Sequence, residues 1–338
     1  MLKGYELVSK VDIGFAPPER PMCHGATIAE LPDGRLIAAW YEGSYELDKR
    51  SAIVMSTSYS PGWSWTAPRV AAAMPGLAVG NPVLFVTPQG DVLLFFVIVY
   101  GKTWTSSKIA VRRIAQCELV PAGPGGDPQL SPVYSEDTWP RLICDHEGWM
   151  TRNKPIALGP DEWLLPVYDE ALWCPMVLAT RDAGRSWREY GDTTMYGVPI
   201  QPTLVELTDG RILMLTRTNR GRVWRSFSYN RGATWTVCQP IELPNPDSGL
   251  DAVRAGDGTL LLCMNDAERG RDRLVITESR DEGESWHQRT LVDESRGGEV
   301  SYPAIVAGSN GLIHVAYTWE RVSIRHAVFR RRPDSSQN

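Results

Sequence analysis

Six polar side chains of varied chemistry recur along the sequence in a shared local pattern. Each one precedes a small residue or proline and an apolar stretch, and in most copies an Asp-Gly type of turn follows. This pattern is typical of a strand, a tight turn and a second strand. Together the six side chains offer an imidazole and a phenol for proton transfer, and amine, amide and carboxylate groups for binding. They are His24, Asn81, Lys154, Gln201, Asp251 and Tyr302.

A second repeat indicates how neighbouring strands are connected. Its order is Ser or Thr, any residue, Asp or Asn, any residue, Gly, any residue, Ser or Thr, and Trp. The Asp or Asn side chain can bond backbone N–H groups of a turn, Gly can take a positive φ, and Trp can pack beneath the turn. We therefore assign the motif a structural role. Clear copies span 180–187, 228–235 and 279–286, with a weaker copy at 58–65.

The spacing of the first pattern predicts one ring of similar units. The chain has 338 residues, of which 43% are hydrophobic and 22% charged, as in folded globular proteins. Most intervals between the leading residues are close to the about 40–50 residues that four short strands need. Extra length between Asn81 and Lys154 predicts an insertion near 118–150. No Pro/Gly linker divides the chain, so we expect a single domain over 1–338.

The turn motif resembles the Asp box, or bacterial neuraminidase repeat, of the sialidase superfamily. Together with the six leading residues, this resemblance covers nearly the whole chain. It implies an all-β fold, namely a six-bladed β-propeller with four strands in each blade. Residues 5–13 are then expected to form the fourth strand of the last blade and to close the ring, which would cover an open strand edge. The leading residues should converge on the central funnel.

The resemblance also implies roles for individual residues. Sialidases hold the substrate carboxylate with three arginines and use a tyrosine nucleophile that a glutamate activates. Arg217 matches the second of these arginines, and Arg271 matches the third, with Arg273 as a less suitable substitute. Tyr302, in the run Tyr-Pro-Ala-Ile, matches the nucleophile. The resemblance therefore implies an anion-binding funnel around this tyrosine.

Two positions depart from the family pattern. His24 stands where the first arginine belongs, and Gln201 stands where the glutamate belongs. An amide cannot take a proton, so another group must activate the tyrosine, and an imidazole that titrates near neutrality is suited to this. The acidic loop 41–48 falls where the family keeps its acid/base aspartate. Asp48 is the best match there, and Glu42 or Glu46 could replace it.

The remaining candidates are expected to bind substrate. Lys154 could stabilise negative charge on the tyrosine through its own positive charge. Asn81 and Asp251 are expected to face the same funnel from their blades. Arg225 lies one strand from Arg217 and could also reach the pocket.

These residues favour a sialidase-like glycoside hydrolase that acts on a carboxylate-bearing sugar, such as sialic acid or a related acidic sugar. The reason is that a guanidinium group binds a carboxylate through two parallel hydrogen bonds. A lyase acting on a uronic-acid glycoside and a non-catalytic glycan-binding propeller are the alternatives. The expected partner is an acidic oligosaccharide or glycoside, and neither a cofactor nor a metal is predicted.

Charge and composition exclude other classes of partner. The net charge is −5 and no long basic run is present, which argues against nucleic-acid binding. No stretch approaches the roughly 18–20 apolar residues of a membrane span. The N-terminus lacks the apolar core of a signal peptide, and the six cysteines are scattered, so we expect a cytoplasmic protein. The sequence does not specify an oligomeric state.

Overall fold

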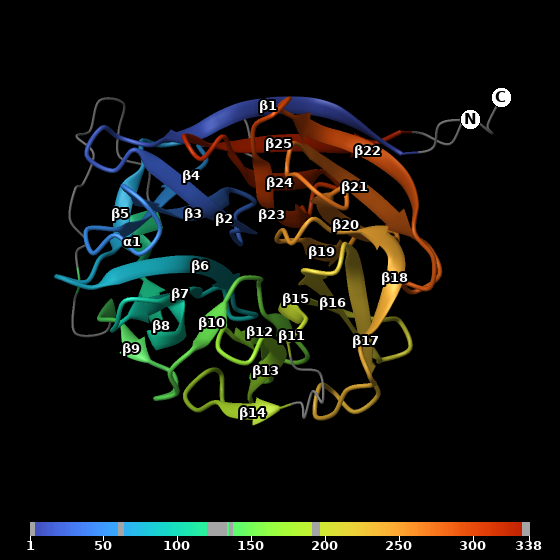
Figure 1. Cartoon of the computed structure of the whole chain (residues 1–338), viewed down its shortest axis with the longest axis horizontal. Coiled ribbons are helices and arrows are strands. Elements are labelled where there is room, and N and C mark those ends of the chain that lie inside the picture. Colours follow the sequence, from blue (N-terminus) through green and yellow to red (C-terminus); the bar gives the residue numbers. More distant parts are fainter. Residues whose placement is uncertain (1–3, 60–63, 120–133, 135–137, 191–196, 333–338) are drawn as a thin grey trace.

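The structure is a six-bladed β-propeller, which confirms the predicted fold class (Figure 1). It is a computed structural model that describes residues 4–59, 64–119, 134, 138–190 and 197–332. The first strand of each blade lies nearest the centre of the ring, and later strands follow outward (Figure 1). In this described part, no helix is long and apolar enough to cross a membrane.

Blades 1 to 3 come from the first half of the chain. Blade 1 contains β2 (Met22–Glu30), β3 (Leu36–Gly43), β4 (Ala52–Thr57) and β5 (Arg69–Ala72). Blade 2 contains β6 (Ala78–Val86), β7 (Val92–Val99), β8 (Ser107–Ile114) and β9 (Arg141–Leu142). Blade 3 contains β10 (Trp149–Thr151), β11 (Ile156–Ala157), β12 (Trp163–Asp169), β13 (Cys174–Thr180) and β14 (Arg188–Tyr190). Both β10 and β11 pair with β12, so the inner strand of blade 3 is interrupted at 152–155.

Blades 4 to 6 come from the second half. Blade 4 contains β15 (Pro199–Glu206), β16 (Ile212–Thr218), β17 (Arg222–Ser228) and β18 (Gln239–Pro244). Blade 5 contains β19 (Asp251–Arg254), β20 (Leu260–Asn265), β21 (Arg273–Ser279) and β22 (His287–Glu294). Blade 6 contains β23 (Val300–Ala307), β24 (Ile313–Trp319), β25 (Ser323–Arg331) and β1 (Tyr5–Phe15).

Two short helices lie on either side of β8 in the described part of the chain. The 3-10 helix η1 (Trp104–Ser106) connects β7 to β8, and α1 (Gln116–Leu119) follows β8. Residues 120–133 and 135–137 of the predicted insertion lie outside the described residues. Of the elements described, α1 overlaps the start of the predicted insertion and β9 lies within it.

The turn motifs join neighbouring blades through their tryptophans. In the first clear copy, Asp182 accepts hydrogen bonds from the backbone N–H of Ser186 (2.9 Å) and from its hydroxyl (2.6 Å). These bonds lower the pKa of Asp182 to about 2. The following Trp187 of blade 3 packs edge-on against Phe95 of blade 2, with ring centroids 5.7 Å apart. The motif thus fixes a turn and places an aromatic ring between two sheets, as its residue types predict.

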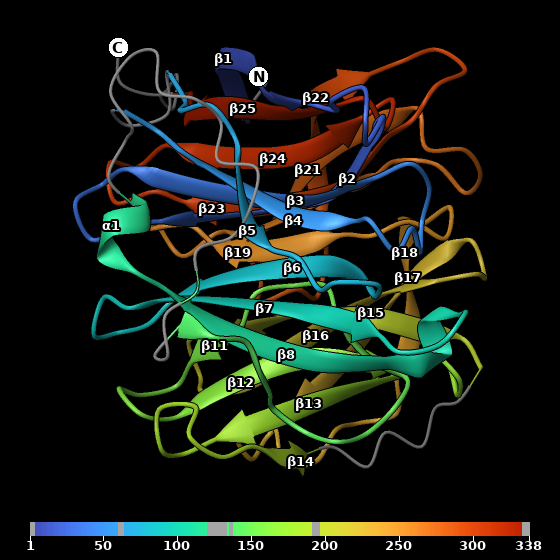
Figure 2. The same ribbon diagram turned by 90° about the vertical axis from the view of Figure 1, so that its left-hand side faces the viewer.

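The ring is closed by two segments from opposite ends of the chain. Strand β1 runs antiparallel to β25, with Tyr5 opposite Arg331 and Phe15 opposite Ser323. It lies at the outer edge of blade 6 in both views (Figures 1 and 2). Tyr5 and Ile13 of β1 are buried, whereas Leu7 is 49% exposed. The outermost strand therefore contributes both backbone pairing and apolar packing.

Deleting residues 1–13 is expected to destabilise the propeller, because the deletion exposes the edge of β25 and removes two buried side chains. Burying a side chain of that size contributes about 1.5–3 kcal/mol. The midpoint of thermal unfolding should then fall by about 5–10 °C. Ile13→Ala should reproduce part of this loss, while Leu7→Ala on the exposed face of β1 should change the midpoint little. Unchanged unfolding of the truncated chain would show that β1 contributes nothing to stability.

Candidate active site

A bulge near the start of the inner strand turns side chains toward the centre in four of the six blades. The strand register shifts in β2, β6, β15 and β23. At these shifts Gly25, Asn81, Gln201 and Tyr302 have positive φ values of 68°, 47°, 51° and 52°. For residues other than glycine this conformation costs about 1–3 kcal/mol and is concentrated at functional sites. Three of the six predicted leading residues therefore occupy strained positions that face the funnel.

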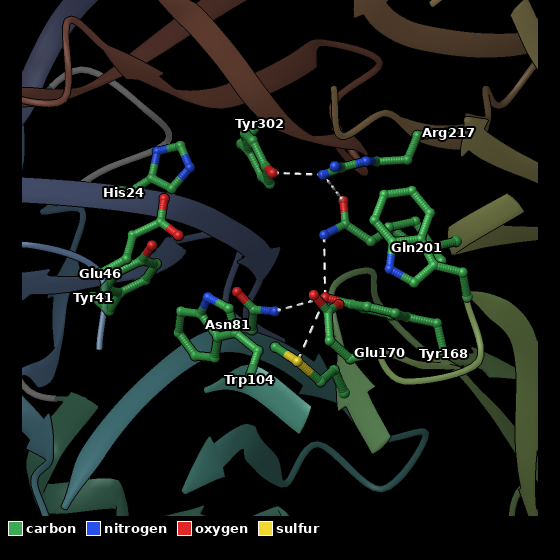
Figure 3. A pocket seen from close by; sticks show the side chains of 13 residues that line it. His24, Tyr41, Glu46, Asn81, Trp104, Tyr168, Glu170, Gln201, Arg217 and Tyr302 are labelled. Atoms are coloured by element: carbon green, nitrogen blue, oxygen red, sulfur yellow. Dashed lines mark hydrogen bonds between the residues drawn. The ribbon is translucent and has the colours of Figure 1, made fainter. Parts of the chain in front are cut away.

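The position of the bulge in blade 1 differs by one residue from the predicted one. The residue equivalent to Asn81, Gln201 and Tyr302 is Gly25, one position after the predicted His24. The neighbouring His24 still points into the funnel, because it lies beside the bulge (Figure 3). In blades 3 and 5 neither Lys154 nor Asp251 has a positive φ. The sequence pattern is thus shared by six blades but the bulge is not.

The funnel contains a polar pocket of about 510 Å³, including space that is open to solvent. Its walls come from the first and second strands of the blades and from the loops beside them (Figure 3). Most of the side chains that line the pocket are polar and at least half-buried, and two tryptophans lie beside them. The lining residues are His24, Tyr41, Glu46, Asn81, Trp104, Met150, Tyr168, Glu170, Trp173, Ile200, Gln201, Arg217 and Tyr302.

A chain of hydrogen bonds links the residues of the strained bulges. One terminal nitrogen of Arg217 donates to the Tyr302 hydroxyl (2.6 Å) and to Gln201 Oε1 (3.1 Å). The Nε2 group of Gln201 donates to the Tyr168 hydroxyl (3.2 Å), which also accepts from Nδ2 of Asn81 (3.3 Å). Gln201 therefore orients Arg217 rather than contacting the Tyr302 hydroxyl. The glutamine at this position is a positioning group for a guanidinium.

Three guanidinium groups surround the Tyr302 ring. The central carbon atoms of Arg152, Arg271 and Arg217 lie 5.1, 5.4 and 5.9 Å from the ring centroid. Such cations are attracted to the aromatic face and favour negative charge that develops on the phenolic oxygen. Burial on its own would lower the pKa of Arg217, but the interactions with the Tyr302 phenol and the Asp247 carboxylate raise it above the usual value. Arg217 therefore stays charged in the pocket wall.

Arg152 is the least expected of these groups. It lies in the interruption of the inner strand of blade 3, and it is only 2% exposed. Its terminal nitrogens donate to the backbone carbonyls of Ala26 (3.3 Å) and Pro303 (3.0 Å). Within the described residues its Nε atom has no hydrogen-bond partner. Since burial lowers the pKa of this guanidinium, negative charge on Tyr302 or on a ligand would stabilise it.

His24 is a buried neutral imidazole beside Tyr302. It is 3% exposed, and the centroids of the two rings lie 4.3 Å apart. Burial lowers the pKa of His24 well below its usual value, and the charges of Arg321 and Arg152 lower it further. In the described part of the chain its Nδ1 atom has no hydrogen-bond partner. His24 is therefore present in the pocket wall as a neutral imidazole beside the Tyr302 ring.

Arg271 and Arg217 share Asp247 as a partner. The Asp247 carboxylate accepts from Nε (2.9 Å) and from a terminal nitrogen (2.8 Å) of Arg217, and its backbone carbonyl accepts from Arg271 (2.5 Å). Arg271 also lies 3.5 Å from Glu299. The side chain of Asp247 is 37% exposed, compared with 9% for Arg217. A ligand carboxylate could thus replace Asp247 on this arginine without opening the core.

The structure places Asp48 in a different role from the predicted one. Its two carboxylate oxygens accept from the backbone N–H groups of Ser44 and Arg50, each at 2.9 Å, and so fix the loop after β3. It does not line the pocket, whereas Glu46 does. Glu42, the other alternative, accepts from Trp40 and pairs with Arg20 away from the pocket. The sequence located the acidic loop and offered Glu46 as an alternative, but it ranked Asp48 first.

Lys154 and Asp251 meet near the axis but do not line the pocket. Lys154 Nζ lies 2.6 Å from Asp251 Oδ2 and 2.9 Å from the carbonyl of Ala252. Asp251 also accepts from Thr203 Oγ1 and from the backbone N–H of Ile305, both at 2.9 Å. These bonds connect blades 3, 4, 5 and 6. Lys154 and Asp251, which were predicted to bind substrate, therefore connect the inner strands of neighbouring blades.

Arg225 also lies away from the pocket. It is on β17, the third strand of blade 4, where it faces the neighbouring blade. Its guanidinium donates to the carbonyl of Gly283 (2.6 Å) and pairs with Glu284 (3.1 Å) in the turn motif of blade 5. Arg225 is close to Arg217 in the sequence, but it lies on the next strand outward. Its side chain therefore contacts blade 5 and does not reach the pocket.

Several pocket residues were missed by the sequence reasoning. Tyr168 lies near the end of β12, Glu170 directly follows this strand, and Trp173 lies in the turn to β13. Trp104 comes from η1, and its ring covers Gly80, where a Cβ atom would lie 2.8 Å away from it. In the sequence, Gly80 directly before Asn81 is the local sign that a large side chain packs there. Within the described residues, no group of three or more His, Cys, Asp or Glu side chains is arranged to hold a metal ion.

Four-stranded blades, Asp-containing turns and a funnel with a tyrosine among arginines define a sialidase-type β-propeller. Residues 34–315 match the family described as the BNR repeat-like domain. The protein therefore belongs to this family, and it shares the propeller fold of sialidases. A comparison with curated proteins finds no match.

Solved structures share this fold at low sequence identity. A protein of unknown function from Dyadobacter fermentans is similar with a TM-score of 0.75 and 15% identity, over 98% of this chain and 100% of that chain. The Hadza microbial sialidase Hz136 has a TM-score of 0.73 and 18% identity, over 93% of this chain and 66% of that chain. The intramolecular trans-sialidase from Ruminococcus gnavus, solved with oseltamivir carboxylate, has a TM-score of 0.70 and 14% identity, over 94% and 97%.

Proposed function

We propose that the protein is a sialidase-like glycoside hydrolase that acts on a sugar bearing a carboxylate, such as sialic acid or a related acidic sugar. The observation that carries this proposal is the Tyr302 phenol, which faces the pocket among three guanidinium groups. The proteins of similar fold that are named as a sialidase and a trans-sialidase support the same class of substrate. The pocket is polar and open to solvent, so a sugar held in it could extend into solvent with the rest of the glycoside.

In this proposal the arginines bind and the phenol reacts. The substrate carboxylate takes the place of the Asp247 side chain on Arg217 and is also held by Arg271. The Tyr302 oxygen then forms a bond to the anomeric carbon as the glycosidic bond breaks, and its proton passes to the neutral His24. Arg217 donates to the same oxygen and stabilises its charge. Water later cleaves the sugar–tyrosine bond and restores the free phenol.

A second candidate is an elimination reaction on a uronic-acid glycoside. Among the described residues, the hydrogen bond of the Tyr302 hydroxyl is with Arg217 and not with a carboxylate. A phenol beside a cation and a neutral imidazole can also exchange a proton with the carbon next to a neutralised carboxylate. The electron pair of that C–H bond then forms a C=C bond as the glycosidic bond breaks. This observation favours a lyase over a non-catalytic glycan-binding propeller.

Mass spectrometry of products distinguishes these functions. The purified protein is incubated with oligosaccharides that carry sialic, ketodeoxy or uronic acids. Hydrolysis adds the mass of one water to the products, whereas elimination adds none and creates an unsaturated sugar that absorbs ultraviolet light. The proposal expects hydrolysis of an acidic sugar. Elimination would support the second candidate, and binding without turnover would support the glycan-binding alternative.

Replacing Arg217 or Arg271 with alanine is expected to weaken binding of an acidic sugar. A hydrogen bond to a charged group contributes about 1.5–3 kcal/mol, so the affinity should fall roughly ten- to hundredfold. Asp247→Ala should change affinity in the opposite direction, because Asp247 competes for Arg217. Calorimetric titration with the free sugar measures these differences. Equal affinity in all three variants would exclude carboxylate binding at this pair.

A further inference from the structure

Glu170 occupies the wall of the pocket formed by blade 3. It directly follows β12, and its backbone N–H donates to the carbonyl of Gly148 (2.8 Å). The preceding Asp169 accepts from the backbone N–H groups of Ala171 and Leu172, each at 2.8 Å, which fixes the turn. The side chain of Glu170 then points into the pocket beside Tyr168, on the side away from Tyr302 and His24 (Figure 3).

The other carboxylates near the funnel are engaged by arginines. Each forms an ion pair at 2.7–2.8 Å, which holds it as a hydrogen-bond acceptor. The pairs are Glu46 with Arg321, Asp247 with Arg217 and Glu299 with Arg321. Among the described residues, no arginine or lysine pairs with Glu170 in this way. In the described part of the chain, Glu170 is therefore the carboxyl of the pocket wall that is not held in an ion pair.

The surroundings of Glu170 also favour its neutral form. Burial raises the pKa of Glu170 above its usual value, although the charge of Arg217 opposes this. The nearby carboxylates of Asp169 and Asp247 raise it further. A larger share of this carboxyl thus keeps its proton near neutral pH than in a free glutamate. Such a group is suited to proton donation in a transition state.

We propose that Glu170 is the general acid that protonates the leaving glycosidic oxygen. This assignment rests on the proposed function. As the bond between the anomeric carbon and the glycosidic oxygen breaks, that oxygen keeps the electron pair and takes the proton of Glu170. The resulting carboxylate then removes a proton from the water that cleaves the sugar–tyrosine bond, and Glu170 regains its starting form. The acid thus comes from blade 3, opposite Tyr302, and not from the loop of blade 1.

Glu170→Gln tests this role through the leaving group. The kcat/KM values are compared for two glycosides of the same acidic sugar, one with an alkyl and one with a nitrophenyl leaving group. The alkyl glycoside needs a proton on its leaving oxygen, so the variant should lose about 10²–10⁴-fold on it. A nitrophenolate leaves without a proton, so the loss on the nitrophenyl glycoside should be less than about tenfold by the same reasoning. Glu170→Asp, which keeps a carboxyl, should retain more activity on the alkyl glycoside than Glu170→Gln.

Glu46→Gln and Asp48→Asn are the matched controls. Any loss in these variants should be the same for both glycosides, because neither carboxylate is placed as the acid. An equal loss on both glycosides in Glu170→Gln would overturn the assignment, as would leaving-group dependence in Glu46→Gln. Wild-type protein that cleaves neither glycoside would overturn the proposed function itself, which separates that failure from a wrong choice of acid.

Discussion

Tyr302→Phe is expected to lower kcat by about 10²–10⁴-fold, with a much smaller change in the affinity for an acidic sugar. The variant keeps the aromatic ring, which contacts His24 and three guanidinium groups. It loses only the hydroxyl, which accepts the 2.6 Å hydrogen bond from Arg217. Because this oxygen is proposed to bond to the sugar, its removal should affect reaction rather than binding. Steady-state kinetics and calorimetric titration measure the two effects separately.

Tyr168→Phe is the matched control for this variant. It removes a phenol from the same pocket, one that accepts from Gln201 and Asn81 but is not assigned to the reaction. The loss of such hydrogen bonds costs about 0.5–1.5 kcal/mol each, and no bond to the sugar is lost, so the rate should fall much less than in Tyr302→Phe. A Tyr302→Phe variant as active as wild type would refute the assignment of Tyr302.

The second large effect is expected at His24. His24→Ala should lower kcat by about 10²–10⁴-fold, because the neutral imidazole is proposed to accept the Tyr302 proton. The direction of its pKa shift changes the expected pH dependence. A free imidazole gains charge near pH 6.5, but burial and the surrounding arginines keep His24 neutral to well below that value. The activity of the wild type should therefore persist through pH 6.5 and fall only at lower pH.

His24→Arg separates the two roles that this position could have. If His24 only replaces the first arginine of sialidases as a carboxylate donor, His24→Arg would keep or raise the activity on a sialoside. If His24 is the base, the same variant should be as impaired as His24→Ala. A drop in wild-type activity centred near pH 6.5 would also argue against a buried neutral histidine as the group that controls the reaction.

The fold was predictable because its signals are local and repeated. The Asp box and the strand–turn–strand pattern each encode one turn or one hairpin, and six copies define a closed ring. Asn81, Gln201 and Tyr302 were found by the same pattern, and each of these three residues lies in a strained bulge before a proline. Lys154 and Asp251 share the pattern without the bulge and pair with each other instead. The backbone conformation decides whether such a residue lies in a bulge at the pocket or pairs with another blade, and residue types alone do not fix this conformation.

The parts of the site that were missed depend on contacts between blades. Arg152 lies in an interrupted strand, and its burial under Tyr302 follows from the packing of blades 3 and 6. Glu170 lies at the end of a second strand, where no repeat marks it. Asp48 and Glu46 belong to one loop, and the turn that Asp48 fixes with Ser44 and Arg50 decides which carboxyl faces the funnel. Such choices arise only when the loop and its neighbours are placed together.

Calorimetric titration of the wild-type protein with an acidic sugar and with its methyl ester tests the central claim most directly. The two ligands share shape and hydroxyl groups and differ in the carboxylate that Arg217 and Arg271 are proposed to hold. The account predicts that the acid binds roughly ten- to hundredfold more tightly than the ester, because a hydrogen bond to a charged group contributes about 1.5–3 kcal/mol. Equal affinity for the acid and the ester would contradict it.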